Sequence, residues 1–96
     1  MRESAIEKAI CQCARENGFL CYKFTSPQHR GVPDRIFINP QGVTCYLEIK
    51  MPGEEPTPLQ YRELKKLCER GTPAGWADSL GGGAAFLKKY KDTKIS

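Results

Sequence analysis

The sequence predicts one α/β domain in which a mixed sheet is flanked by helices. Three observations carry this prediction: an amphipathic helical stripe near the N-terminus, three strand-like segments in a row, and a later helical segment with a marked start and stop. The expected order is α-β-β-β-α-β, with a short helix at the end. Because 96 residues can bury one modest core, residues 1–96 are expected to form a single domain.

The first helix is expected over residues 3–17, where apolar residues recur at helical spacing and Gly18 provides a stop. A strand is expected over 19–25, which is rich in aromatic and β-favouring residues. Prolines and a glycine indicate a loop over 26–33. The apolar stripe of the helix consists of Ile6, Ala9, Ile10, Cys13 and Ala14.

The next two strands, 34–39 and 43–50, are separated by a short turn and should pair as a hairpin. The second of them alternates with a period of two residues, so its side chains divide between two faces. One face carries Val43, Cys45, Leu47 and Ile49, and the other carries Thr44, Tyr46, Glu48 and Lys50.

The second half of the chain begins with an exposed loop over 51–57. Thr57 is the expected N-cap of a helix with Pro58 at its first position, and Gly71 ends this helix after about residue 70. The remaining expectations are a weaker strand at 74–79, a flexible glycine run at 81–83, a short helix at 84–91 and a frayed tail at 92–96.

Composition excludes some classes of protein. The net charge of +4 permits a polyanionic partner without requiring one. No apolar run is long enough to span a membrane, and the N-terminus does not resemble a signal peptide, so no membrane partner and a cytoplasmic location are expected, in a bacterium or a phage-infected host. The five cysteines contain no CxxC pair and are interpreted as small core or surface residues.

Three residues of the predicted hairpin carry the chemistry. Glu48 and Lys50 point to the same side of their strand, roughly 6.6 Å apart, and Asp34 begins the partner strand. Two carboxylates from adjacent strands form a hard oxygen site suited to Mg²⁺ or Mn²⁺. The Glu-x-Lys triplet alone is common and would more often be an ordinary ion pair, so the site is predicted from its combination with Asp34.

Three short motifs resemble the VRR-NUC family, a branch of the PD-(D/E)xK nuclease superfamily. They are Gly31-Val32-Pro33-Asp34-Arg35, Glu48-Ile49-Lys50 and Pro58-Leu59-Gln60, within a similarity that runs from about residue 3 to residue 79. The resemblance implies a restriction-endonuclease-like core and divalent-metal-dependent cleavage of DNA.

The resemblance also implies a role for each matching residue. Asp34 and Glu48 would bind the metal, the Ile49 backbone carbonyl would be a further ligand, and Lys50 would be the catalytic lysine. A glutamate of the first helix would complete the cluster. Glu3 and Glu7 both border the apolar stripe, so both stay candidates.

Gln60 has two interpretations. Thr57-x-x-Gln60 is a capping box, in which the glutamine bonds back to the Thr57 backbone. The resemblance instead directs Gln60 to the active site, where it would position Lys50 or a phosphate. Basic residues are candidates for phosphate binding, although a lone histidine in a loop is more often a bystander. The DNA-binding candidates are Lys23, His29, Arg30 and Arg35.

The expected reaction is phosphodiester hydrolysis in DNA, with branched DNA such as a four-way junction as the expected substrate. The alternatives are a flap, nick or end-processing nuclease and a DNA-binding module without catalysis. Cutting two strands of a junction needs two active sites, so a homodimer is expected. Its possible contact residues are Phe19, Tyr61, Trp76 and Phe86.

Overall fold

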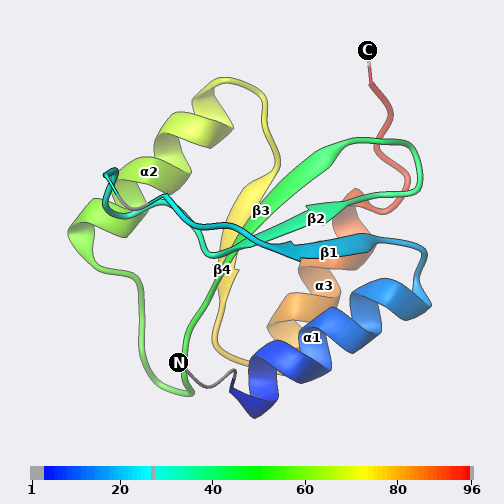
Figure 1. Cartoon of the computed structure of the whole chain (residues 1–96), viewed down its shortest axis with the longest axis horizontal. Helices are drawn as coiled ribbons and strands as arrows, with labels where there is room; N and C mark the ends of the chain where they lie inside the picture. Colours follow the sequence, from blue (N-terminus) through cyan, green and yellow to red (C-terminus); the bar gives the residue numbers. More distant parts are fainter. Residues whose placement is uncertain (1–3, 27, 96) are drawn as a thin grey trace.

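The computed structural model describes residues 4–26 and 28–95, which fold into a four-stranded sheet and three helices (Figure 1). The predicted order α-β-β-β-α-β with a final helix is confirmed. None of the helices in these residues is long and apolar enough to cross a membrane. In chain order the elements are α1 (Ala5–Glu16), β1 (Leu20–Lys23), β2 (Arg35–Ile38), β3 (Thr44–Ile49), α2 (Pro58–Glu69), β4 (Ala74–Ala77) and α3 (Leu80–Tyr90).

The sheet has the strand order β1-β2-β3-β4 and is mixed, as predicted. β1, β2 and β3 pair antiparallel, whereas β4 pairs parallel with β3. A parallel neighbour requires a crossover connection, which α2 supplies. The register places Arg35 opposite Leu47 on β3, and Leu47 in turn opposite Gly75 on β4.

The core lies between the sheet and the pair α1 and α3, which lie side by side in Figure 1. β3 supplies Cys45 and Leu47 to this core, as its alternation predicted, and both are fully buried. α2 lies apart from α1 and α3, beside the loop between β1 and β2 (Figure 1). The buried cluster consists of Ile10, Cys11, Ala14, Phe19, Phe37, Cys45, Leu47, Ala77 and Leu87.

The glycine run at 81–83 is not a flexible connection, and that prediction was wrong. These residues form the first turn of α3, where Ser79 is the N-cap and accepts a hydrogen bond from the Gly82 backbone N–H at 3.0 Å. A Cβ at Gly83 would lie 2.6 Å from the Ile10 side chain. Gly83 therefore lets α3 approach α1 closely, which offsets its poor helix propensity.

A buried asparagine contacts the segment that follows α3, while the fraying of residues 92–96 stays a prediction. Asn39 is 3% exposed, and its Nδ2 donates to the carbonyls of Tyr90 and Thr93, both at 2.8 Å. Its Oδ1 accepts from the backbone N–H groups of Gln41 and Val43. One buried amide therefore ties the chain after α3 to the β2–β3 turn, as expected for a buried polar group that must be satisfied.

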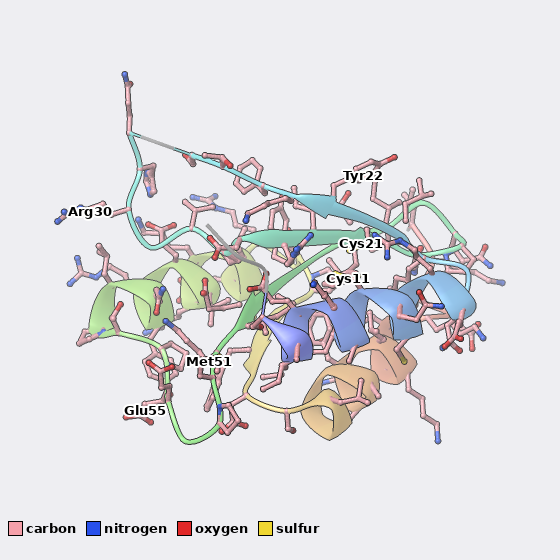
Figure 2. The ribbon with its side chains drawn as sticks, turned by 60° about the horizontal axis from the view of Figure 1, so that its bottom comes forward. Cys11, Cys21, Tyr22, Arg30, Met51 and Glu55 are labelled. Carbon is pink, nitrogen blue, oxygen red and sulfur yellow. The ribbon has the colours of Figure 1, made fainter. Side chains whose placement is uncertain are left out.

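Cys11 of α1 and Cys21 of β1 face each other across the helix–sheet interface (Figure 2). Their sulfur atoms lie 2.8 Å apart, with the Cys21 thiol donating to Cys11. Burial raises the pKa of the Cys45 thiol to about 11. Cys45 therefore stays protonated at neutral pH, as the interpretation of a core cysteine requires.

Candidate active site

Asp34 and Glu48 are brought together by the pairing of β2 with β3. Arg35 lies opposite Leu47, so the next position along this ladder places Asp34 opposite Glu48. The ladder continues past β2 on its other side too, because the Phe24 backbone N–H donates to the Asp34 carbonyl at 2.7 Å. Residues opposite each other share one face of a sheet, so both carboxyl groups lie on the same side.

Glu48 is a buried carboxyl group whose charged form the protein stabilises poorly. It is 3% exposed, and its Oε1 has no hydrogen-bond partner among the described residues. Burial first and the nearby Asp34 carboxylate second raise the Glu48 pKa from 4.5 to about 7, while Lys50 opposes the rise and Glu7 adds to it. A carboxylate in this position is stabilised by a proton or by a cation.

Lys50 follows the end of β3 and is half-buried. Its backbone N–H donates to the Ala77 carbonyl at 2.8 Å, which fixes the main chain beside β4. Its ammonium group lies close enough to lower the pKa of Glu48. The Ile49 side chain packs against the core on the opposite face, as alternation predicted. That the Ile49 carbonyl is a metal ligand stays a prediction.

Glu7 lies in the first turn of α1 and is held by Arg35, whose Nε donates to Glu7 Oε2 at 3.3 Å. Arg35 is only 6% exposed and faces α1. Its predicted role in gripping a DNA phosphate is therefore corrected: alternation along β2 turns its side chain into the interface between helix and sheet. Glu3, the other candidate on the first helix, lies outside the described residues.

The donor set fits a hard divalent cation only in part as it stands. Asp34 and Glu48 supply carboxylate oxygens on one face, and the unpartnered Glu48 oxygen is the kind of atom that a cation satisfies. No three histidine, cysteine, aspartate or glutamate side chains within 4–26 and 28–95 are close enough to hold one ion together. Glu7 is paired with Arg35, so it would have to leave that pair to become a third carboxylate ligand.

Gln60 forms the predicted capping box. Its Oε1 accepts from the Thr57 backbone N–H at 2.9 Å, and its own N–H donates to Thr57 Oγ1 at 3.2 Å. Gln60 also lines a pocket that contains Asp34. The capping contact is thus present, and the predicted contact with Lys50 or a phosphate stays a prediction.

Three predicted DNA-binding residues lie around that same pocket, which has a volume of about 320 Å³. Lys23 comes from the end of β1, while His29 and Arg30 come from the loop before β2. All three are exposed, and Arg30 extends outward from the loop in Figure 2. The pocket therefore joins basic groups to one carboxylate of the site. Its lining consists of Lys23, Phe24, Thr25, Ser26, His29, Arg30, Gly31, Val32, Asp34 and Gln60.

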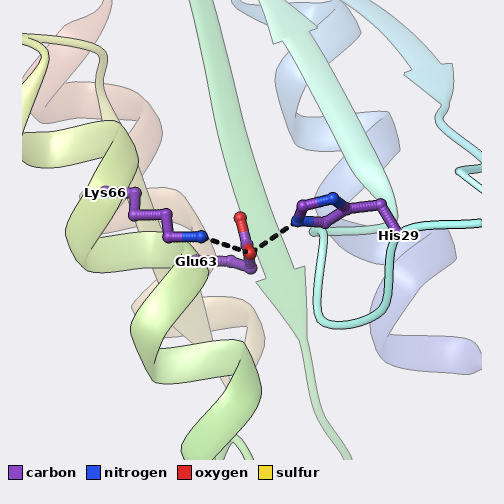
Figure 3. Close-up of polar contacts among 3 residues, drawn as sticks. All are labelled: His29, Glu63 and Lys66. Carbon is purple, nitrogen blue, oxygen red and sulfur yellow. Dashed lines mark hydrogen bonds and ion pairs between the residues drawn. The ribbon is translucent and has the colours of Figure 1, made fainter.

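The sequence analysis did not find Glu63, a residue of α2. Glu63 Oε1 lies 2.6 Å from His29 Nε2 and accepts from Lys66 Nζ at 3.2 Å (Figure 3). His29 therefore has a specific partner on α2, and its role in DNA binding stays a prediction. The available signal was weak: Glu63 follows Gln60 by three positions, so the two share one side of α2.

Comparisons with known proteins agree with this architecture. No family model matches the sequence. A protein of Acyrthosiphon pisum secondary endosymbiont phage 1, named "Putative nuclease p44", is 46% identical over 71 residues, which span 74% of this chain and 76% of that protein.

Two solved structures share the fold. One, described as a VRR_NUC domain, has a TM-score of 0.80 at 26% identity and covers 88% of this chain and 92% of its own. The other, described as a VRR_NUC domain protein, has a TM-score of 0.70 at 13% identity and covers 98% and 93%. These likenesses, together with the GxPD, ExK and PxQ motifs of the sequence, show that the chain belongs to the VRR-NUC domain family.

Proposed function

We propose that this protein is a divalent-metal-dependent DNA endonuclease that hydrolyses phosphodiester bonds. The observation that carries the proposal is the buried Glu48 oxygen, which has no hydrogen-bond partner among the described residues and lies beside Asp34 and Lys50. The name of the phage relative, a nuclease, supports the same class of reaction.

Each residue of the site has a distinct role in the proposal. Asp34 and Glu48 hold Mg²⁺ or Mn²⁺, with the Ile49 carbonyl and a glutamate of α1, Glu7 or Glu3, completing the oxygen set. The cation, when bound, supplies a water of lowered pKa and polarises the scissile phosphate.

Lys50 places a positive charge beside the two carboxylates, where it orients the attacking water or stabilises charge that develops on the phosphate. Burial of Glu48 strengthens these interactions because water screens them less. Gln60, at the edge of the pocket that contains Asp34, positions Lys50 or a phosphate.

The proposed substrate is branched DNA, and the proposed active form is a homodimer in the cytosol of a bacterial or phage-infected cell. One site cuts one strand, so two-fold symmetric cutting of a four-way junction requires two protomers. Among the four contact candidates, Phe19 is buried and Phe86 is half-buried. Tyr61 and Trp76 are 40% and 36% exposed and stack edge-to-face, so they are the better contact residues.

Cleavage assays on labelled four-way junctions, flaps, nicked duplex and linear duplex test the function. We expect cutting of branched DNA with Mg²⁺ or Mn²⁺, and none in excess EDTA. Cutting confined to flaps, nicks or ends would replace the junction with the corresponding substrate. Undiminished cutting in EDTA contradicts the metal site, and binding without cutting under all conditions contradicts the nuclease.

Sedimentation equilibrium, with and without junction DNA, tests the dimer. We expect twice the 10.8 kDa mass of the chain, and Trp76→Ala is expected to shift the population toward the monomer. A monomer mass in both conditions would exclude the dimer and favour flaps or nicks as substrates.

A further inference from the structure

The loop before β2 is packed tightly onto the start of α2. Gly31 adopts a φ of +84°, a conformation that residues with a side chain rarely adopt. A Cβ at this position would lie 2.9 Å from the Leu59 carbonyl oxygen. The backbone of the loop therefore lies against the first turn of α2, closer than any other residue type allows.

A second contact holds the same loop, two residues earlier. His29 Nε2 and Glu63 Oε1 are 2.6 Å apart, although the two residues are 34 positions apart in the sequence (Figure 3). The Glu63 side chain is only 12% exposed, whereas that of His29 is 55% exposed. Glu63 is therefore the anchored partner, and His29 is the group that it holds.

The anchored loop separates two pockets. His29 and Arg30 line the pocket of about 320 Å³ that contains Asp34, and they also line a second pocket of about 370 Å³ over α2. Any movement of the loop would change both pockets and the position of Arg30. The second pocket is lined by Gln28, His29, Arg30, Leu59, Arg62, Glu63 and Lys66.

Glu63 is the only carboxylate among the residues that line this second pocket. A carboxylate beside a phosphate-binding surface is unfavourable unless its charge is compensated. Its Oε1 is shared between His29 and Lys66, and both contacts lower the Glu63 pKa. The negative charge is thus used within the protein rather than presented to a ligand.

We propose that Glu63 is a positioning residue for DNA: by holding His29 it fixes the loop so that Arg30 and Lys23 bind a backbone phosphate in the pocket beside Asp34. The ligand is a phosphodiester group of the DNA strand, next to the one that is cut. This inference rests on the proposed nuclease function, because it needs DNA at the site. Without the His29–Glu63 contact the loop would lose conformational entropy when DNA binds, and this cost would weaken binding.

A double-mutant cycle of DNA affinity tests the proposal. Anisotropy of a fluorescein-labelled duplex in EDTA, where no cutting is expected, is measured for wild type, His29→Ala, Glu63→Ala and the double variant. We expect each single variant to bind about 10-fold more weakly and the double variant to bind no more weakly than either. Thermal unfolding in parallel shows whether each variant is folded.

The direction of the change in DNA affinity distinguishes a positioning role of Glu63 from a general effect of its negative charge. Removing an acidic residue should by itself strengthen DNA binding, and Glu69→Ala, an exposed acidic residue of α2, is the matched control for that. Arg30→Ala and Glu63→Ala should each reduce the slope of affinity against salt by about 1. Glu63→Gln keeps an acceptor for His29 and should restore most of the affinity.

The proposal is overturned if Glu63→Ala binds DNA as tightly as wild type or more tightly. It is also overturned if the effects of the two single variants add, or if Glu63→Gln binds no better than Glu63→Ala. Failure of the nuclease proposal looks different: wild type would bind DNA without cutting any substrate, whatever the outcome of the cycle.

Discussion

Glu48 and Glu63 are both shielded carboxyl groups, yet their surroundings move their pKa values in opposite directions. Glu48 is buried near Asp34, and one of its oxygens has no hydrogen-bond partner among the described residues, so its pKa rises to about 7. Hydrogen bonds from His29 and Lys66 lower the pKa of Glu63, with His29 the larger cause. The opposite shifts follow from the groups around each carboxyl: Glu63 accepts hydrogen bonds from two basic side chains, whereas Glu48 is buried beside a second carboxylate.

The comparison teaches how to distinguish a ligand from a structural carboxylate. A carboxylate whose partners are supplied by the protein is already stabilised and has little to gain from a cation. A buried carboxylate without partners destabilises the metal-free protein and gains most when a cation binds. On this criterion Glu48 belongs to the chemistry and Glu63 to the architecture that surrounds it.

The largest expected effect is the loss of cleavage in Glu48→Gln. The amide keeps the shape of the side chain but removes the charge that binds the cation, so single-turnover cleavage should fall on the order of 1000-fold. Glu63→Gln is the matched control and should retain cleavage within about 10-fold. Comparable rates for the two variants would contradict the distinction between the two carboxylates.

The next effect is a pH dependence of stability without metal. A raised pKa means that the folded protein binds more protons than the unfolded chain, so stability is fully present below pH 4.5 and is lost as pH rises through about 7. The rise of the Glu48 pKa from 4.5 to about 7 corresponds to a loss of about 3 kcal/mol in the free energy of unfolding.

Urea unfolding from pH 5 to pH 8 measures this loss. Glu48→Gln should abolish most of it and should be more stable than wild type at pH 8 in EDTA. Added Mg²⁺ should raise the stability of the wild type more at pH 8 than at pH 5. If the free energy of unfolding of the wild type does not change between pH 5 and pH 8, the Glu48 pKa is not raised in the folded protein.

Lys50→Ala should lower turnover about 100-fold while DNA affinity stays nearly unchanged. Lys50 is one of 15 basic residues, and its charge acts directly on Glu48, so its removal should affect the transition state more than binding. Cleavage rates and anisotropy on the same DNA separate these effects. Lys65→Ala, on the exposed side of α2, controls for the loss of one positive charge. Equal cleavage rates for the two variants would show that Lys50 is not the catalytic lysine.

The smallest expected effect is on the acid side, at Glu63. A lowered pKa means that its contribution to stability is present above the unfolded pKa and is lost as pH falls through the folded value. Glu63→Gln should cost no more than about 1 kcal/mol at pH 7, because the partners His29 and Lys66 are exposed. The difference from wild type should vanish in acid, and a difference that grows as pH falls would reverse the sign assigned here.

Local regularities made much of the fold and part of the site predictable. The apolar stripe of α1, the capping box before α2 and the hairpin depend on spacings of a few residues, and all three are present. Asp34 and Glu48 were expected together because a short turn and a period of two leave few alternatives. The glycines at 81–83 were misjudged because their reason lies in α1, far away in the sequence.

The sequence by itself determined the order of elements, the mixed sheet and the meeting of Asp34 with Glu48, since hydrophobic periodicity and turn length act between neighbours in the chain. Only the tertiary structure decided that Arg35 is buried against Glu7 and that His29 is held by Glu63. These contacts depend on how α1 and α2 pack around the sheet. Packing sums many weak interactions between distant segments, and no single spacing in the sequence encodes that sum.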